Sequence, residues 1–272
     1  MPSCGAVATA RTALLALLAL LATGCGVGAA EVADPEATAA RVAGEAGAPA
    51  EGRGPQGAGT TSGTRRWMTP RRIFAIARVR AGRSVTLRAA PGGRPVKRLR
   101  SRTEFGSRRF LAVAARERGW LGVVSAERPN GRLGWVDGGS SALTPYRTDV
   151  SLHVDLSRRE LVLREGTRIR RRVHVGIGRA GYPTPSGRFA VTDKLSGRAY
   201  GGTYGCCIVA LSGHQTRLPP GWPGGDRLAL HGTRDQGSIG NAASTGCLRA
   251  SDDDLRALLR RVPLGAPVFI RR

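Results

Sequence analysis

Short apolar runs separated by turn-forming residues make up the segment from 70 to 145. The runs lie at 74–79, 84–89, 110–115, 120–124 and 133–136. A turn-forming triplet, Pro129, Asn130 and Gly131, stands between the last two, and strands are commonly bounded by such residues. Several short strands with turns of this kind predict a small β-barrel.

Residues 150–272 also have the pattern of strands until close to the C-terminus. Leu152, Val154 and Leu156 alternate with other residues, and alternate residues of a strand face the same side. Further strands are expected at 161–163, 172–177, 204–211, 228–231 and 268–270. The sequence therefore predicts a mainly β chain.

One short helix is expected near the C-terminus. Ser251 is followed three residues later by Asp254, the spacing of a capping box, and three aspartates at 252–254 suit the first turn of a helix. Pro263 and Gly265 end the pattern. The apolar residues recur at the spacing of one helical face: Leu255, Leu258, Leu259 and Val262.

The N-terminus has the pattern of an export signal. Arg11 precedes an apolar run from 12 to 23, which is too short to span a bilayer comfortably. The run ends in Leu-Ala-Thr-Gly-Cys at 21–25, which resembles a bacterial lipobox. That resemblance implies a signal peptide at 1–25 and a lipid anchor on Cys25, and ordinary cleavage after Ala30 is the alternative. Both routes predict export to the cell envelope.

Residues 26–69 are expected to form a flexible linker. They are rich in Ala, Gly, Pro and polar residues and contain few large apolar side chains. Such a segment cannot bury a core.

The chain is strongly basic, with a formal net charge of +24. Lys97 and Lys194 are its only lysines, so the charge is carried by Arg. Two explanations are open: the coding bias of a GC-rich genome, or attraction to an anionic polymer of the cell wall. There is no zinc-finger spacing, aromatic RNA-binding motif or basic helix with heptads, so no nucleic-acid partner is predicted.

Three cysteines lie beyond the signal peptide, at 206, 207 and 247. Three do not form the disulfide framework of a compact secreted domain. For Cys206 and Cys207, packing on a strand is favoured over a vicinal disulfide, because neighbours on a strand face opposite sides. Cys247 is then the candidate reactive thiol.

Cys247 needs a base, because a thiol is largely protonated at neutral pH. His231, at the end of an apolar strand, can accept that proton if the fold brings the two together. Small residues beside the cysteine leave backbone N–H groups, such as those of Gly246 and Cys247, to hold an oxyanion. Arg249 would favour a thiolate and the aspartates at 252–254 would disfavour it, and the balance stays open.

The spacing of these residues resembles the catalytic domain of the L,D-transpeptidases, also called YkuD-type. His231 and Gly232 precede Ser-Thr-Gly-Cys-Leu-Arg at 244–249, and Asp254 matches an acidic residue that often follows. Thr-Pro-Ser-Gly-Arg-Phe at 184–189 matches a second element of the family. The similarity covers residues 150–272 and implies a β-sandwich with a short C-terminal helix.

The resemblance also implies a mechanism. Cys247 would attack the carbonyl between the third and fourth residues of a peptidoglycan stem peptide, release D-alanine and form a thioester. The amine of a neighbouring stem would then make a 3→3 cross-link, with His231 as base and acid. The carbonyl of Gly232 would orient His231, and Arg249, Ser244 and Gly246 would bind substrate or shape the loop. Neither a metal nor an organic cofactor is implied.

Three alternatives remain open. Water as acceptor would give a carboxypeptidase, and a protein amine would give an anchoring transferase. The third is a wall-binding lipoprotein without activity. In residues 70–145, the stretches at 87–91 and 134–136 resemble bacterial SH3-like domains, which implies a small barrel that associates with the wall.

Overall fold

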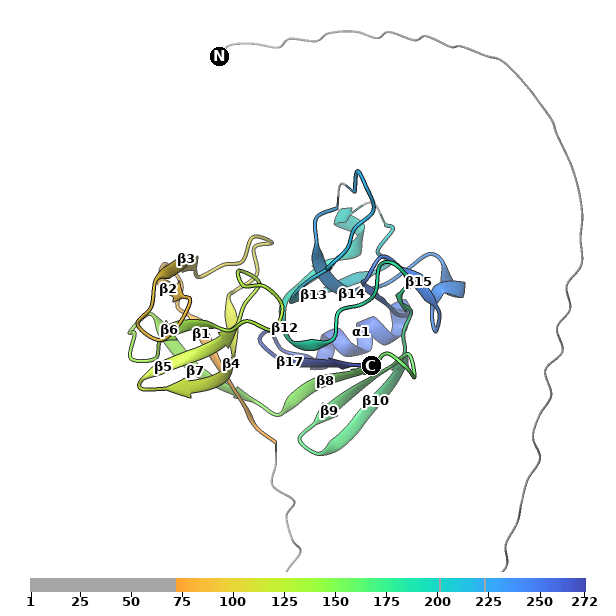
Figure 1. Cartoon of the computed structure of the whole chain (residues 1–272). Coiled ribbons are helices and arrows are strands. Elements are labelled where there is room, and N and C mark those ends of the chain that lie inside the picture. The colour runs from red at the N-terminus through yellow and green to blue at the C-terminus, as the bar shows by residue number, and fades with distance from the viewer. Residues whose placement is uncertain (1–71, 201, 223) are drawn as a thin grey trace, which may run out of the picture. The chain divides into compact units, whose positions relative to one another are not determined.

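The computed structural model describes residues 72–200, 202–222 and 224–272. The predicted signal peptide (1–25), with Cys25, and the whole of the predicted linker (26–69) lie outside the described residues, so both stay predictions. Two large β-sheets and one α-helix make up the described chain (Figure 1).

The first sheet, called here the N-terminal sheet, has seven antiparallel strands in the order β3-β2-β6-β5-β4-β1-β7. Leu87, Leu99, Val123 and Val136 are completely buried in its core. Its strands are β1 (Phe74–Val79), β2 (Ser84–Arg88), β3 (Pro95–Arg100), β4 (Phe110–Glu117), β5 (Trp120–Val124), β6 (Gly134–Asp137) and β7 (Leu143–Thr148).

The second sheet, called here the C-terminal sheet, is mixed and has the strand order β10-β9-β8-β17-β12-β13-β14-β16. The pairs β17–β8 and β14–β16 are parallel. Its strands are β8 (Val150–Asp155), β9 (Glu160–Glu165), β10 (Arg168–His174), β12 (Gly187–Ser196), β13 (Cys207–His214), β14 (Arg227–His231), β16 (Leu248–Arg249) and β17 (Pro267–Arg271). A separate parallel pair joins β11 (Ile177–Gly178) to β15 (Ala242–Ser244).

The helix α1 (Asp252–Arg261) begins where the sequence predicts it. Ser251 is its N-cap, and the Ser251 side chain accepts a hydrogen bond from the amide of Asp254. Leu255 and Leu258 are completely buried in the core of the C-terminal sheet. Two short 3-10 helices lie at Gly197–Tyr200 and Gln236–Ser238. No helix in the described residues is long and apolar enough to cross a membrane.

The predicted fold class is confirmed: the chain is mainly β, with one short helix near the C-terminus. Five strands had no counterpart in the sequence pattern. Three of them, β12, β15 and β16, lie within residues 187–249, and the other two are β3 and β7. Both lie at the edges of the N-terminal sheet, where a strand is not covered on both sides and polar residues are tolerated. In β3 only Leu99 is fully buried.

The preference for unlinked packing of Cys206 and Cys207 was wrong, because the two residues form a vicinal disulfide. The prediction placed both on one strand, whose side chains would face opposite sides. In the structure β13 begins only at Cys207, and Cys206 belongs to the turn before it. Within that turn Gly205 has a φ of +59°, so the alternation rule does not apply to the pair.

Candidate active site

Cys247 and His231 line the same cavity, which has a volume of about 380 Å³. His231 is the last residue of β14, and Cys247 comes directly before β16. These two strands pair in parallel, with Leu230 opposite Leu248 and His231 opposite Arg249. By this register Cys247 lies level with Ala229, two residues before His231. The pairing of the two strands therefore places the predicted nucleophile and the predicted base beside the same cavity.

The imidazole of His231 is held by a backbone carbonyl. Its Nδ1 lies 2.6 Å from the carbonyl oxygen of Gly232, so Nδ1 carries the proton and Nε2 has a free lone pair. The ring of Tyr204 packs edge-on against it, with 4.7 Å between centroids. Burial lowers the pKa of His231 to about 4, and Arg249 adds to this while the hydrogen bond to Gly232 opposes it. The imidazole is therefore neutral at pH 7.

The thiol of Cys247 is also buried and neutral. Its Sγ lies 3.5 Å from the amide nitrogen Nε2 of Gln215 and donates to the carbonyl oxygen of Arg227 at 3.8 Å. Burial raises the pKa of Cys247 to about 11, and this is opposed by a backbone hydrogen bond from Ala229 and by the charge of Arg249. At neutral pH almost all of the thiol is protonated.

No hydrogen bond between Cys247 and His231 occurs in the described structure, where the thiol points to Arg227. Both groups are neutral, so this is not a preformed thiolate–imidazolium pair. Catalytic hydrogen bonds are often long or misaligned before substrate binds. The arrangement can take a proton from the thiol as the sulfur turns toward an incoming carbonyl.

The loop that carries Cys247 is fixed by two hydroxyl groups. Oγ of Ser244 donates to the carbonyl of Cys247 at 2.5 Å and accepts from the amide of Gly246 at 3.1 Å. Oγ1 of Thr184 donates to the carbonyl of Gly246 at 2.8 Å. Gly246 has a φ of +122°, which a residue with a side chain rarely adopts. Because the amide of Gly246 is engaged, the amide of Cys247 is left as the candidate oxyanion donor.

Residues 149–270 match the family model of the L,D-transpeptidase catalytic domain. We call this segment the L,D-transpeptidase domain, after the family model that it matches. The match begins after the N-terminal sheet, for which the SH3-like resemblance stays a prediction.

Two relatives support the assignment of the L,D-transpeptidase domain. The inferred L,D-transpeptidase YkuD of Bacillus subtilis (strain 168) is 28% identical over 128 residues, which cover 47% of this chain and 70% of that protein. Its counterpart in Bacillus licheniformis is 31% identical over 126 residues, which cover 46% of this chain and 66% of that protein.

Two solved structures of the same family are similar at low identity. An L,D-transpeptidase from Mycobacterium smegmatis has 17% identity and a TM-score of 0.35, over 52% of this chain and 73% of that one. L,D-transpeptidase 3 from Mycobacterium tuberculosis, with a faropenem-derived adduct, has 17% identity and a TM-score of 0.38 over the same shares. The assignment rests on the sequence matches and not on these scores.

Arg249 is the charged residue that acts on both central groups of the L,D-transpeptidase domain. It lines the cavity, its Nη1 lies 3.6 Å from Asp235, and its Nε is buried without a hydrogen-bond partner among the described residues. The aspartates of α1 have other partners: Asp252 accepts from the amide of Cys206 at 2.9 Å, and Asp254 pairs with Arg171. The sequence left open whether Arg249 or the aspartates at 252–254 would dominate the charge around the thiol. Arg249 is the charged group that lowers the pKa of Cys247.

Several residues of the cavity were not predicted as site residues. They include Phe105, Tyr204, Gln215, Trp222 and Arg227. Trp222 lies in the Gly- and Pro-rich stretch at 212–225, whose composition is the one signal that could have indicated a wall of the cavity. Within the described residues, no group of three or more His, Cys, Asp or Glu side chains could hold a metal ion.

Proposed function

We propose that the chain is a cell-wall L,D-transpeptidase that forms 3→3 peptidoglycan cross-links through a thioester on Cys247. The observation that carries the proposal is the shared cavity of Cys247 and His231, in which Gly232 holds Nδ1 and leaves Nε2 free. A nucleophile, a base and a group that orients the base are the elements of covalent acyl transfer.

In the first half-reaction one proton passes from Cys247 to His231 and then from His231 to the leaving amine. Sγ of Cys247 attacks the stem-peptide carbonyl while Nε2 of His231 takes the thiol proton, so charge develops only as the new C–S bond forms. The amide of Cys247 donates to the oxyanion. When the C–N bond breaks, His231 returns the proton to the departing D-alanine, and the thioester remains on Cys247.

The second half-reaction reverses these roles. The amine of a neighbouring stem attacks the thioester carbonyl, and His231 accepts a proton from that amine. The tetrahedral intermediate expels Sγ, which regains the proton from His231. The products are the cross-linked peptide and the resting enzyme, so no cofactor is consumed.

Arg249, Ser244 and Gly246 have supporting roles in this proposal. Arg249 is a cation in the cavity with a buried, unpaired Nε, which suits a substrate carboxylate. Ser244 and Gly246 hold the cysteine loop through the hydrogen bonds described above. None of the three transfers a proton in the reaction.

The wider assignment follows from the sequence. We propose an exported lipoprotein with a signal peptide at 1–25, lipidation at Cys25 and a linker at 26–69. A wall-associated SH3-like domain at 70–145 would then precede the catalytic domain at 150–272. The substrates are peptidoglycan stem peptides, and anionic wall polymers are further partners.

The test is intact-protein mass of the chain without its first 25 residues, mixed with a purified tetrapeptide muropeptide, with chromatography of the products. We expect an adduct that lacks D-alanine on the wild type, no adduct on Cys247→Ala, and muropeptide dimers. An adduct with only tripeptide product would indicate a carboxypeptidase. Neither adduct nor product would overturn the proposal in favour of a wall-binding protein.

A further inference from the structure

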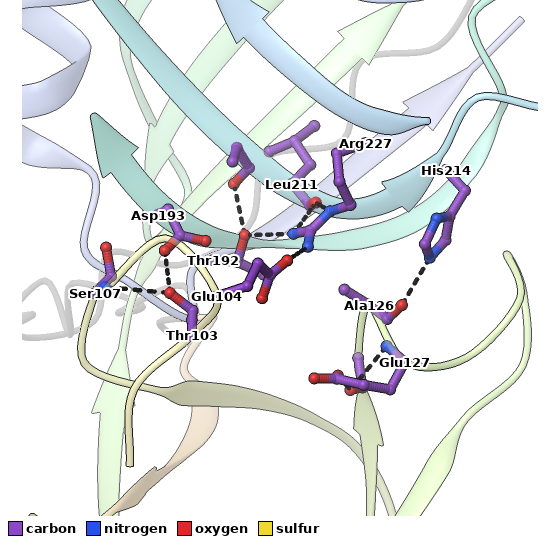
Figure 2. A network of polar contacts seen from close by, with 12 residues as sticks. Thr103, Glu104, Ser107, Ala126, Glu127, Thr192, Asp193, Leu211, His214 and Arg227 are labelled. Carbon is purple, nitrogen blue, oxygen red and sulfur yellow. Dashed lines mark hydrogen bonds and ion pairs between the residues drawn. The ribbon is translucent and has the colours of Figure 1, made fainter. Parts of the chain in front are cut away.

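A loop of the N-terminal sheet reaches the cavity of the L,D-transpeptidase domain. It lies between β3 and β4 and consists of Thr103, Glu104 and Phe105, called here the 103–105 loop. Phe105 lines the cavity together with Cys247 and His231. Both sheets belong to the same compact unit of the chain, and Figure 2 shows the polar contacts that join them.

The loop is anchored at its base on β12. The hydroxyl of Thr103 donates to the carboxylate of Asp193 (Figure 2), which is completely buried. The same hydroxyl accepts from the amide of Ser107 at 3.1 Å. A buried carboxylate needs such donors, so the position of the loop on the C-terminal sheet is specified by a polar contact and not by apolar packing alone.

Glu104 and Phe105 both contact Arg227, the first residue of β14. The carboxylate of Glu104 forms an ion pair with Nη1 of Arg227 (Figure 2). The ring of Phe105 lies under the guanidinium, with its centroid 5.6 Å from Cζ. The side chain of Arg227 is only 16% exposed and that of Glu104 is 49% exposed, so the loop covers a largely buried cation.

The remaining donors of Arg227 are used by the C-terminal sheet itself. Nη2 donates to the hydroxyl of Thr192 at 2.9 Å and to the carbonyl of Leu211 at 2.8 Å, and Nε donates to that same carbonyl at 3.1 Å. The pairing of β13 with β14 shifts register between Ala210 and His214. The shift interrupts the ladder at Leu211, whose carbonyl binds the guanidinium.

The backbone of Arg227 faces the opposite way, toward the nucleophile. Its carbonyl oxygen accepts the thiol of Cys247 at 3.8 Å and Nε2 of Gln215 at 3.3 Å. The same Nε2 lies 3.5 Å from Sγ of Cys247. Gln215 is 8% exposed, and its Oε1 is buried with no partner among the described residues. One residue thus links the 103–105 loop to the resting position of the thiol.

We infer that the 103–105 loop is a positioning element of the active site. The loop holds Arg227 in place, and the carbonyl of Arg227, together with the side-chain amide of Gln215, sets the position of the Cys247 thiol. Phe105 also forms one wall of the cavity for substrate. The N-terminal sheet is then part of the acyl-transfer site and not only a wall-binding module. The kinetic part of this inference rests on the proposed function, whereas the effect on the thiol does not.

The first experiment measures alkylation of Cys247 by iodoacetamide in the full chain, purified in detergent. Mass spectrometry of the tryptic peptide 235–249 reports this cysteine alone. We expect Glu104→Gln and Phe105→Ala to change the rate at pH 8 at least threefold. The matched control is Glu165→Gln, which removes an exposed Arg–Glu pair with Arg170 at the far edge of the C-terminal sheet and should leave the rate unchanged.

Kinetics with the tetrapeptide muropeptide separate the two roles. Glu104→Gln should lower kcat about tenfold with little change in KM, and Glu104→Asp should restore most of it. Phe105→Ala should raise KM. Unchanged alkylation and unchanged constants in variants with the wild-type Tm would overturn the inference. If the wild type has no transpeptidase activity but the alkylation rates differ as stated, the proposed function fails and the positioning role stands.

A measurement on the wild type covers the case in which a variant does not fold. Alkylation of Cys247 displaces its thiol from the carbonyl of Arg227, so hydrogen exchange at the amides of 103–107 should change at least threefold. The amide of Gly106, which bonds the carbonyl of Thr103 at 3.1 Å, is the most direct reporter. Equal exchange before and after alkylation would contradict the coupling.

Discussion

The carbonyl of Gly232 lies 2.6 Å from Nδ1 of His231, and this contact decides which nitrogen faces the cavity. The orienting group is a backbone atom of the very next residue. No acidic side chain is needed to set the tautomer, because the carbonyl accepts only from a protonated Nδ1.

Gly232→Ala should destabilise the protein and impair the base. A Cβ at this position would come within 2.4 Å of the carboxylate of Asp252 and 2.8 Å of Cα of Gly205. Such overpacking costs about 1–3 kcal/mol, to be measured by urea unfolding, and kcat should fall as the carbonyl moves. Gly237→Ala is the matched control, because its Cβ would meet nothing closer than 3.5 Å. Equal unfolding midpoints for both variants would contradict this reading.

Removing the charge of Arg249 should shift the pKa values of Cys247 and His231 in the same direction. Its cation favours the thiolate and disfavours the imidazolium, so it lowers the pKa of Cys247 and of His231. In Arg249→Gln both pKa values should rise. Alkylation at pH 8 should slow at least threefold, and the acid limb of activity should shift to higher pH.

The control for that experiment is Arg170→Gln, which removes an exposed arginine paired with Glu165. In the wild type, the alkylation rate should climb about tenfold per pH unit from pH 7 to pH 10, because the thiolate fraction rises up to the pKa of about 11. A plateau near neutral pH would show a preformed thiolate instead.

The buried His231 should make the fold sensitive to acid. Its pKa is about 4 in the folded state and 6.5 in the reference state, so the unfolded chain binds more protons between these values. This contribution to stability is complete above pH 6.5 and is lost as the pH falls to 4, by up to about 3 kcal/mol. His231→Asn should lack this loss, as measured by urea unfolding at pH 7 and pH 4.5.

The wild type must be compared with His231→Asn because the pKa of His153 is lowered in the same direction as that of His231. Its pKa is also lowered to about 4, chiefly by burial, and it is present in both. A difference in unfolding free energy that does not change with pH would exclude the contribution from His231.

The N-terminal sheet should bind anionic polymers in a salt-dependent way. Residues 72–148 contain seventeen Arg and Lys and four Asp and Glu. Lys97, Arg98 and Arg100 line one open hollow of about 920 Å³. The double change Arg98→Gln, Arg100→Gln should weaken sedimentation with phosphate-rich wall polymer severalfold at low salt, and salt should weaken it further. The pair Arg170→Gln, Arg172→Gln is the control, and equal loss would indicate only net charge.

The elements with a local signature could be predicted from the sequence. The helix after Ser251 is specified by its cap and by the spacing of Leu255 and Leu258, which lie within one short window. The predicted pair of Cys247 and His231 shares one cavity because β14, which ends at His231, pairs with β16, which directly follows Cys247. Both features could be predicted because the types of these residues, and their spacing, are typical of the structure or chemistry in which they take part.

The rest of the site depends on contacts that no local pattern contains. Phe105 lies more than a hundred residues before Gln215 and Arg227. Arg227 contacts Cys247 through a backbone carbonyl, which every residue type has, so its identity could not indicate this role. The edge strand β3 was missed because only one of its side chains needs to be apolar. Each miss involves a contact that exists only after the chain has folded.

The disulfide between Cys206 and Cys207 matters for the exported protein proposed above. In the described part of the chain these two residues bind each other, and Cys247 is the only free cysteine. An oxidising compartment threatens any enzyme that depends on a thiol, because a second thiol in the same domain can capture it. Here the adjacent pair binds both of the other thiols, so within the described residues the proposed nucleophile has no free thiol with which to form a disulfide.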